Sequence, residues 1–440
     1  MRHNKLALAS VVAAGALALS ACSSAGGTTA DPSSAETFNP NEQVTLTLTW
    51  WGNDDRASRY QEAIALFEEA YPNITVQPTF SPWDDYWTAR STEAASRSLP
   101  DVMQFDLSYM REYADNDMLL NLQPYLDNGT IDLSGFDPSL VSAGVLDEKQ
   151  VAIPTSTNTF SMFTNPAILD QTGVAFPDDA TYTWQDFNQF IADTTAAGAT
   201  TDDGYAIYGS PDYTGTFWFF MQWLLQKGVQ PFAEDGSLGF TQDDVVEFLN
   251  LTADLRAAGQ TYPQDRTVAL TPVSGFASNE AAAQMNWDNF LASDSADSGS
   301  ELALHQIPSI EPGEKHLFLK PSMLLVAGAN TEHAAAAATL INFLLTEPEV
   351  GAIFGTSKGV PADVVQRDKV EAAPGSIDAQ VIAYEESISR DVTETVPIPV
   401  KGYGTIEAKW KTLAEEVAYG NLTPEDFAKQ WFDEAELAMS

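Results

Sequence analysis

Aromatic residues in this 440-residue chain repeatedly stand beside carboxylates or amides, where predicted strands and helices begin or end. Trp51 is followed by Asn53 and Asp54, and Trp83 is followed by two aspartates. An aromatic ring can cover the C–H face of a polyhydroxylated ring, while carboxylates and amides hydrogen-bond to the hydroxyl groups at its edge. These residue types predict a binding site for a sugar-like molecule, although most of the 10 Trp, 14 Tyr and 23 Phe must form the core.

The first of these groups has two interpretations. Alternation along the first predicted strand puts Trp50 on the buried face and Trp51 off it, at the carboxyl end, where open α/β sheets bind ligands. Trp51 therefore contacts a ligand or packs under the following loop. Asn53 and Asp54 bind hydroxyl groups or cap the helix that begins near Arg56.

Further candidates stand near the ends of other predicted elements or in a loop. Asp106 follows a strand, with Tyr109 three residues on, and its carboxylate can accept two hydroxyl donors. Trp218 begins an apolar helix that is otherwise core, so we expect it to be exposed. Tyr403 lies in a glycine-flanked loop that could close over a ligand. One of Trp83 and Trp87 is expected to face the ligand, and Trp83 is favoured because its helix has barely begun there.

Hydrolase chemistry is not supported by the spacing of the residues that it needs. Gly355–Gly359 matches the G-x-S-x-G pattern, which requires a histidine after Ser357 in the chain. The histidines are His3, His305, His316 and His333. A glycosidase needs two placed carboxylates, and pairs among 62 acidic residues are not informative. We therefore predict that the protein is not an enzyme.

Cofactor sites are not indicated either. A lone cysteine and scattered histidines argue against zinc, and no G-x-x-x-x-G-K-[ST] loop is present. We expect no cofactor. The alternative ligand is a cationic amine, because aromatic rings with acids at their edge also suit a quaternary ammonium group. An anionic solute would need convergent arginines, and the candidate loops contain only Arg56.

The elements that position these residues indicate an α/β fold. The chain alternates between strands and helices up to residue 105, in the order 44–50, 56–72, 74–80, 82–97 and 101–105. This order predicts a largely parallel sheet. Helices are expected near 184–197, 217–227, 242–258 and 332–345, and strands near 205–208 and 318–328. Residues 293–300 read as a Ser/Asp/Gly loop.

The N-terminus has the layout of a secretory signal. Arg2 and Lys5 precede the apolar run 6–19, which is too short to span a membrane, since a spanning helix needs about 20 residues. Leu19–Cys22 resembles the bacterial lipobox, which implies cleavage after residue 21 and a lipid on Cys22, the only cysteine. Residues 22–43 then form a flexible tether. We expect the protein at the extracytoplasmic face of the cell membrane.

The net charge bears on which partners the protein can bind, and the chain length bears on the number of hydrophobic cores. The 62 acidic and 21 basic residues give a net charge of −41. Loss of Arg2 and Lys5 with the signal gives 19 − 62 = −43. Such a charge repels phosphate backbones and argues against a nucleic acid partner. The chain is also longer than the size at which one core usually splits into two.

The order of motifs resembles the extracellular solute-binding protein family that serves carbohydrate import, with the maltose-binding type of fold. The residues that carry the resemblance are Thr49–Gly52, Ala70–Ile74, Trp83–Trp87, Leu99–Asp106, Ala152–Asn158, Ala334–Pro348 and Gly355–Pro361. The resemblance covers essentially the whole mature chain.

The resemblance implies two α/β lobes with a ligand cleft and a hinge between them. By similarity the first lobe is 44–154 plus 318–358, and the second is 155–317 plus 359–440. It also implies a monomer that delivers a carbohydrate, expected to be a neutral oligosaccharide, to the permease subunits of an ABC transporter. The segment around Trp287 and Asn289 resembles the one that enters the cleft in this family, and Asn158 lies in the inferred crossing segment.

Overall fold

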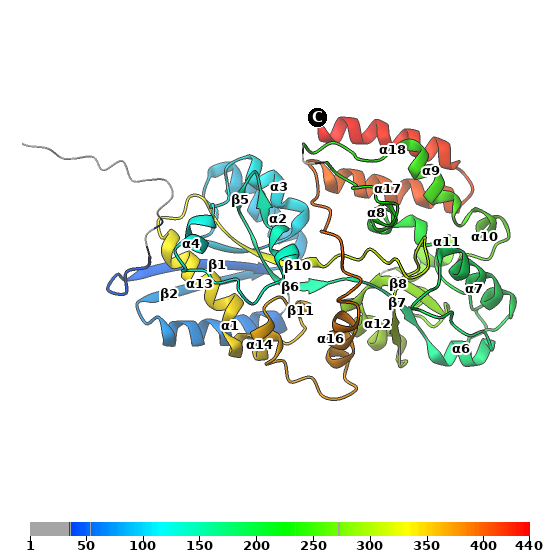
Figure 1. The fold of residues 1–440 in the computed structure, drawn as a ribbon, viewed down its shortest axis with the longest axis horizontal. Helices are drawn as coiled ribbons and strands as arrows, with labels where there is room; N and C mark the ends of the chain where they lie inside the picture. Colours follow the sequence, from blue (N-terminus) through cyan, green and yellow to red (C-terminus); the bar gives the residue numbers. More distant parts are fainter. Residues whose placement is uncertain (1–34, 36, 53, 234, 272) are drawn as a thin grey trace, which may run out of the picture. The chain divides into compact units, whose positions relative to one another are not determined.

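The computed structural model describes residues 35, 37–52, 54–233, 235–271 and 273–440. The predicted signal peptide (1–21), Cys22, most of the predicted tether and Asn53 lie outside these residues. Figure 1 shows the described chain, whose strands form a six-stranded sheet, a three-stranded sheet and a two-stranded hairpin.

The first sheet is mixed rather than largely parallel, with the strand order β11-β6-β10-β3-β1-β2. Its strands are β1 (Val44–Trp51), β2 (Ile74–Ser81), β3 (Val102–Phe105), β6 (Ile153–Asn158), β10 (Lys320–Ala327) and β11 (Val360–Pro361). β1 pairs in parallel with β2 and β3, as expected from the strand–helix alternation. β10 and β11 come from later in the chain and pair antiparallel, which the local pattern did not predict.

Helices cover both faces of this sheet, and the alternation of β1 sets which residue meets which face. Trp50 is 1% exposed and stacks on Tyr60 of α1 (Asp54–Ala70), with ring centroids 4.2 Å apart. Trp51 points to the other face and packs on Tyr86 of α2 (Trp83–Ser96). Figure 1 shows α1 and α13 (Ala334–Thr346) on one side of the strands and α2 and α3 (Leu107–Asp115) on the other.

Shorter elements complete the set of helices and strands around the first sheet. They are α4 (Gln123–Asp127), α5 (Pro138–Ser142), the hairpin of β4 (Val145–Leu146) with β5 (Lys149–Gln150), α14 (Pro348–Phe354) and α15 (Val364–Arg367). Within the described residues no single helix is long and apolar enough to cross a membrane, and α13 with α14 meets that test only as a pair bent by 65°.

The second sheet is antiparallel, with the order β8-β7-β9. Its strands are β7 (Phe160–Thr164), β8 (Ala283–Trp287) and β9 (Ala303–His305). Around it lie α6 (Pro166–Thr172), α7 (Trp184–Ala196), α8 (Phe217–Gln226), α9 (Gln242–Asn250), α10 (Ala253–Ala257), α11 (Gln264–Leu270), α12 (Leu291–Ser298), α16 (Ile377–Ser387), α17 (Tyr403–Ala418) and α18 (Pro424–Met439). The 3-10 turns are η1 (Tyr213–Gly215) and η2 (Asp288–Phe290).

The chain passes between the two sheets more than once. It leaves the first sheet at Thr159, between β6 and β7, returns ahead of β10, and leaves again between α15 and α16. The predicted lobes divide at 358, whereas β11 at 360–361 still pairs with β6 in the first sheet. The lobe boundaries stay a prediction.

Three local expectations were wrong. Residues 242–258 form two helices, since the backbone leaves the helical region at Thr252, with φ −110° and ψ 10°. The Thr252 side chain there donates a hydrogen bond to Asp212. Residues 293–300 lie mostly in α12, which buries Leu291 and ends at Gly299 in the left-handed region, φ 62°. Residues 205–208 form only isolated bridges.

Candidate ligand-binding site

The first sheet presents one aromatic group at the carboxyl end of β1. Trp83 is 40% exposed and meets Trp51 edge-on, with centroids 4.9 Å apart. Tyr109 stacks on Trp87 at 3.7 Å and 17°. Because Trp83 is the first residue of α2, no preceding turn of that helix covers it. Of the predicted residues in this group, Trp83 presents a ring, whereas Trp51 is buried and supports it.

Asp106 lies at the junction of β3 and α3. It follows β3 and caps α3, where its Oδ1 accepts a hydrogen bond of 2.9 Å from the Ser108 amide. Its charge contributes to raising the pKa of both Tyr403 and Glu407 in α17, after the larger effect of burial. In the same region, Arg111 Nε of α3 donates to the Pro399 carbonyl at 3.1 Å. The charge of Asp106 therefore acts on α17, and the Arg111 bond joins α3 to the segment just before α17.

The second sheet presents a second aromatic group. Trp287, at the end of β8, is half-buried and stacks on Phe160 at 3.9 Å and 25°. Trp218 meets Trp287 at 5.5 Å and 74°, and Tyr403 lies 5.9 Å from Trp218. The predicted residues Trp218, Trp287 and Tyr403 are thus brought together from α8, β8 and α17.

Two expectations about this group were wrong. Trp218 is 7% exposed rather than exposed, because Trp287, Phe318 and Tyr403 surround the start of its helix. Tyr403 is the first residue of α17 and is 1% exposed, so it is not part of a mobile loop. Gly402 ahead of it has φ 75°, and a Cβ there would lie 2.3 Å from the Ala438 carbonyl oxygen.

Two charged residues of this group were missed by sequence reasoning. Lys320, the first residue of β10, holds its Nζ 5.6 Å from the ring centroids of both Trp218 and Trp287. Glu407 accepts a hydrogen bond of 3.2 Å from Tyr403 Oη, one helical turn before it. Burial raises the pKa of Glu407, and the side chains of Tyr403 and Trp218 oppose that rise. The four-residue spacing from Tyr403 is the only local signal that pointed to Glu407.

Of the remaining predicted residues that the structure describes, Asn158 is joined to this group through its strand pairing with Lys320. Asp54 is exposed at the start of α1. Asn158 ends β6 and is 8% exposed, and its Oδ1 has no hydrogen-bond partner among the described residues. The buried Oδ1 of Asn289 likewise has no hydrogen-bond partner among the described residues. A ligand role for these three stays a prediction.

Near the passage from β6 to β7, two carboxyl groups lie in the interior. Asp288 is 0% exposed and Glu385 is 6% exposed, and neither forms an ion pair with a residue that the structure describes. Burial raises the pKa of Glu385 to about 7. Burial, followed by the charge of Glu385, raises the pKa of Asp288 well above its usual range. Burial and mutual repulsion therefore both favour the protonated form of this pair.

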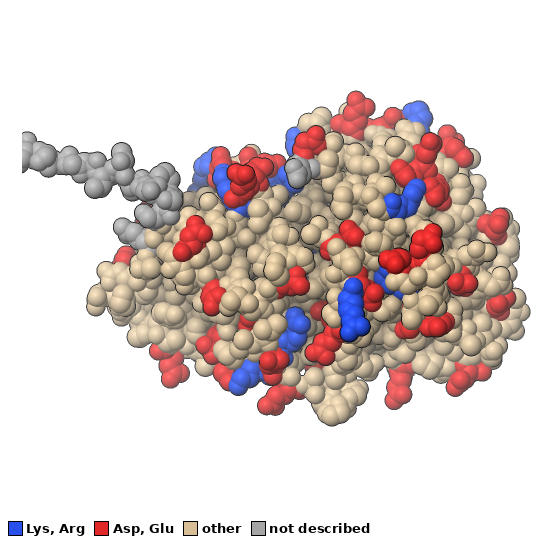
Figure 2. Space-filling view, viewed as in Figure 1, with Lys and Arg blue, Asp and Glu red and all other residues tan. Residues whose placement is uncertain are grey.

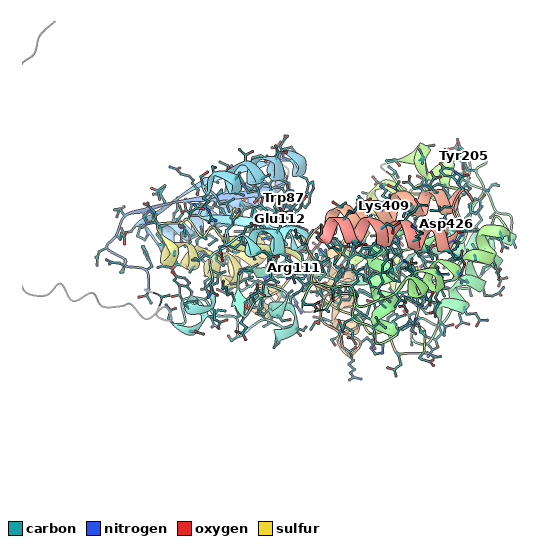
Figure 3. The ribbon with its side chains drawn as sticks, turned by 90° about the horizontal axis from the view of Figure 1, so that it is seen from above. Trp87, Arg111, Glu112, Tyr205, Lys409 and Asp426 are labelled. Atoms are coloured by element: carbon teal, nitrogen blue, oxygen red, sulfur yellow. The ribbon has the colours of Figure 1, made fainter. Side chains whose placement is uncertain are left out.

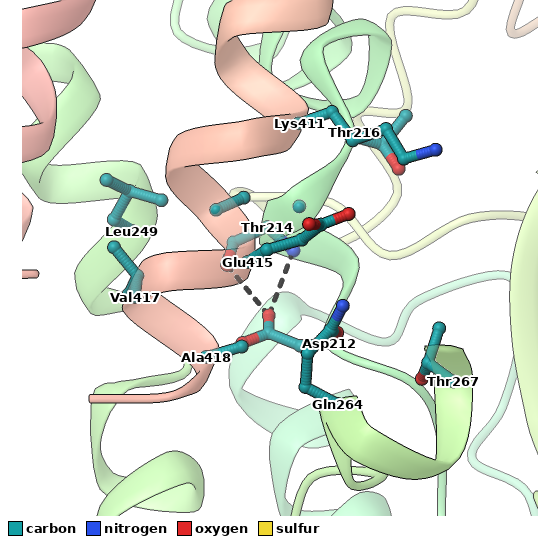
Figure 4. A pocket seen from close by; sticks show the side chains of 12 residues that line it. Asp212, Thr214, Thr216, Leu249, Gln264, Thr267, Lys411, Glu415, Val417 and Ala418 are labelled. Carbon is teal, nitrogen blue, oxygen red and sulfur yellow. Dashed lines mark hydrogen bonds between the residues drawn. The ribbon is translucent and has the colours of Figure 1, made fainter. Parts of the chain in front are cut away.

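A separate small cavity of about 180 Å³ lies between α17 and the segment around η1 (Figure 4). Two carboxylates, Asp212 and Glu415, line it, and Asp212 accepts hydrogen bonds from Thr214 and pairs with Arg256 at 2.9 Å. None of the predicted site residues line it. In the part of the chain that the structure describes, no group of three or more His, Cys, Asp or Glu residues is arranged to hold a metal ion.

Comparison with known proteins agrees with this architecture. A family model described as bacterial extracellular solute-binding protein matches residues 51–350. The solved structure of a family 1 extracellular solute-binding protein from Alicyclobacillus acidocaldarius is 27% identical, with a TM-score of 0.71, over 91% of this chain and 100% of that one.

Two more distant structures share the fold. A periplasmic oligogalacturonide binding protein from Yersinia enterocolitica is 20% identical, with a TM-score of 0.73, over 90% of this chain and 100% of its own. An ABC substrate-binding protein from Listeria monocytogenes, solved with cycloalternan, is 19% identical, with a TM-score of 0.73, over 90% of this chain and 99% of its own. These neighbours have the two-lobe fold of periplasmic solute-binding proteins. The family model spans more than half of the chain, which therefore belongs to the bacterial extracellular solute-binding proteins.

Proposed function

We propose that this protein, a family 1 solute-binding protein of ABC importers, captures a neutral oligosaccharide outside the cytoplasm and delivers it to a membrane permease. The observation that carries the proposal is the group of side chains formed from both sheets. Asp106 and Lys320 come from the first sheet, and Trp218, Trp287 and Glu407 come from the second group of elements.

This group has the chemistry that a pyranose ring requires. Trp287 is held by Phe160 on one face and by the edge of Trp218, so its orientation is set before a ligand arrives. Asp106 and Glu407 accept hydrogen bonds from hydroxyl groups, and Lys320 donates to their oxygens. Pre-organised aromatic and polar groups reduce the entropy lost on binding.

Trp83 supports a ligand longer than one ring. Its ring is 40% exposed on the first-sheet side, whereas Trp287 belongs to the second sheet. Two aromatic surfaces from different elements can stack two different rings of an oligosaccharide. The Yersinia and Listeria structures named above are those of proteins whose described ligands are saccharides.

Charge within the group favours a neutral ligand over an amine or an anion. Lys320 already places an ammonium group near the two indole rings, where a cationic amine would bind. Asp106 and Glu407 would repel a carboxylated or phosphorylated solute.

The test is a thermal-shift screen followed by calorimetry on the purified protein, with neutral mono- to tetrasaccharides, choline and amino acids as probes. Saturating one class should raise the melting temperature, since a ligand at 100 times its Kd stabilises the native state by about 2.7 kcal/mol. Trp287→Ala should abolish the shift. Tyr419→Ala is the matched control, because Tyr419 is 48% exposed and lies outside this group.

Three outcomes would contradict the proposal. A saturable shift with choline alone would show that the ligand is a cationic amine and not a saccharide. A saccharide shift that survives Trp287→Ala would move the site elsewhere. Folded protein that responds to none of the probes would remove the support for a saccharide ligand.

We further propose that Cys22 carries the membrane anchor. The support is its place after an apolar segment and its being the only cysteine. In detergent phase partitioning, the protein expressed with its N-terminus intact should enter the detergent phase, and Cys22→Ser should return it to the aqueous phase. Equal partitioning of both proteins would exclude a lipid on this residue.

A further inference from the structure

A large cavity in the second group of elements is separate from the candidate site. It has a volume of about 540 Å³, within the range of small-molecule pockets, and it is bordered by α6, α11 and the segments at 200–207 and 278–280. It shares none of its residues with the group around Trp287. Figure 3 labels one of its residues, Tyr205, in the green part of the chain, apart from Trp87 and Arg111.

The cavity is lined by an exposed aromatic ring that is held in place by a stacked arginine, which also lines the cavity. Tyr205 is 46% exposed, and the Arg266 guanidinium carbon lies 3.9 Å from its ring centroid. Arg266 Nε donates to Glu280 at 2.9 Å, and Glu280, 4% exposed, also accepts from Tyr262 Oη. The buried glutamate fixes Arg266, and Arg266 covers one face of Tyr205. A ring held in this way can receive a flat ligand on its other face with little loss of entropy.

Two carboxylates stand next to this ring on a tight turn. The Thr201 amide donates to the Tyr205 carbonyl at 2.8 Å, and the Gly204 amide donates to the Thr201 carbonyl at 2.9 Å. This turn puts Asp202 and Asp203 on the lining of the cavity. Neither carboxylate has an ion pair or a side-chain hydrogen bond with a residue that the structure describes, so both can accept from a ligand.

The rest of the lining supplies neutral hydrogen-bonding groups rather than charge. Gln171, Ser278 and Ser300 line the cavity, and the positive charge of Arg266 is paired with Glu280. The two free carboxylates repel an anion. An aromatic face, carboxylate acceptors and neutral amides and hydroxyls together match a neutral saccharide.

We propose that this cavity is a second carbohydrate-binding site, in which one sugar ring stacks on Tyr205 and its hydroxyl groups donate to Asp202 and Asp203. The site does not depend on the ligand of the group around Trp287. It would hold a single ring or the end of a longer glycan, and it would bind weakly because only one aromatic face is offered.

The experiment uses ligand-observed NMR titrations with glucose, galactose, maltose, cellobiose and maltotetraose. The protein is tested as wild type and in a Trp287→Ala background, which disables the proposed principal site. In that background one or more probes should still bind saturably, and Tyr205→Ala should weaken this binding about tenfold, which corresponds to about 1.4 kcal/mol. Tyr205→Phe should retain the binding, since the ring is kept.

Matched variants distinguish binding in this cavity from binding elsewhere on the protein. Tyr419→Ala removes an equally exposed tyrosine outside the cavity and should change nothing. Asp202→Asn with Asp203→Asn should weaken binding without lowering the melting temperature. The proposal is overturned if no probe binds in the Trp287→Ala background, if Tyr205→Ala leaves the binding unchanged, or if only choline, added as a cationic probe, is bound. Because the principal site is already disabled in this background, its failure and the failure of the second site give different results.

Discussion

Thr157 of β6 donates a hydrogen bond of 2.6 Å from Oγ1 to Oε2 of Glu385 in α16. This bond joins a strand of the first sheet to a helix beside the second, next to the point where β6 passes into β7. Glu385 also faces the fully buried Asp288. The passage between the sheets therefore contains a buried carboxyl pair whose surroundings favour the protonated form.

Stability should depend on pH through this pair. The folded-state pKa of Glu385, about 7, lies above its usual value of 4.5, so between these values the folded protein binds more protons than the unfolded chain. Its contribution to stability is then present at low pH and is lost as the pH rises toward 7. Glu385→Gln keeps an acceptor for Thr157 and removes the charge. At pH 8 it should increase the free energy of unfolding by about 3 kcal/mol.

Urea denaturation of both proteins between pH 5 and pH 8.5 measures this effect. The gain from Glu385→Gln should shrink toward pH 5. Glu386→Gln, an exposed neighbour on α16, should stay within about 0.5 kcal/mol of the wild type at every pH. A gain that does not vary with pH would show that the carboxyl pair is not what titrates.

Lys358 is a buried cation without an acidic partner among the residues that the structure describes. It is 9% exposed, its Nζ lies 3.5 Å from the Phe354 ring centroid, and burial, followed by the charge of Arg56, lowers its pKa to about 7. Here the unfolded chain binds more protons between pH 7 and pH 10, so stability rises with pH in that range. Lys358→Met should therefore stabilise the protein at pH 6, by about 2 to 4 kcal/mol, and by less at pH 9.

Denaturation of Lys358→Met at the two pH values tests this. Lys369→Met, which removes an exposed lysine, provides the comparison and should change little. Destabilisation by Lys358→Met at pH 6 would mean that the ammonium group is stabilised by its surroundings more than burial penalises it.

Asp106 has a structural role that can be separated from its proposed ligand role. Asparagine caps a helix about as well as aspartate does, whereas alanine costs about 1 kcal/mol of stability. Asp106→Asn should therefore keep the melting temperature and weaken saccharide binding at least tenfold, because hydrogen bonds to charged groups contribute about 1.5 to 3 kcal/mol. Asp106→Ala should lower the melting temperature and also weaken saccharide binding. Calorimetry and thermal melts on the two variants distinguish these outcomes. Full saccharide affinity in Asp106→Asn would show that Asp106 caps the helix but does not bind the ligand through its charge.

Salt should stabilise the protein. Figure 2 shows Asp and Glu spread over the visible face with fewer Lys and Arg, in line with a net charge of −41. Repulsion among these acids is greatest when the chain is compact, and it is screened as the Debye length falls from about 10 Å at 0.1 M salt to about 3 Å at 1 M. The melting temperature should rise between 0.05 and 1 M NaCl, with sucrose as a neutral control. An unchanged melting temperature would show that the acids do not repel one another in the folded state.

Local pattern determined much of the first sheet. Val44, Leu46 and Leu48 alternate with threonines in β1, and their burial at 4%, 0% and 0% follows directly from a side-chain period of two. The stripe of Tyr60, Ile64 and Phe67 in α1 is likewise buried, as a period of 3.6 residues requires. Both patterns can be read locally because each concerns one element against one face.

Tertiary structure decided what local pattern does not encode. Lys320 and Glu407 lie 87 positions apart in the chain, and only the packing of β10 and α17 puts both beside Trp218. The burial of Trp218 depends on Phe318 and Tyr403, which come from other segments. The sequence by itself determined the family, the strand and helix types and several aromatic candidates. The exposure of each ring and the charges placed against it depended on contacts between distant segments, whose free energies no single window of sequence contains.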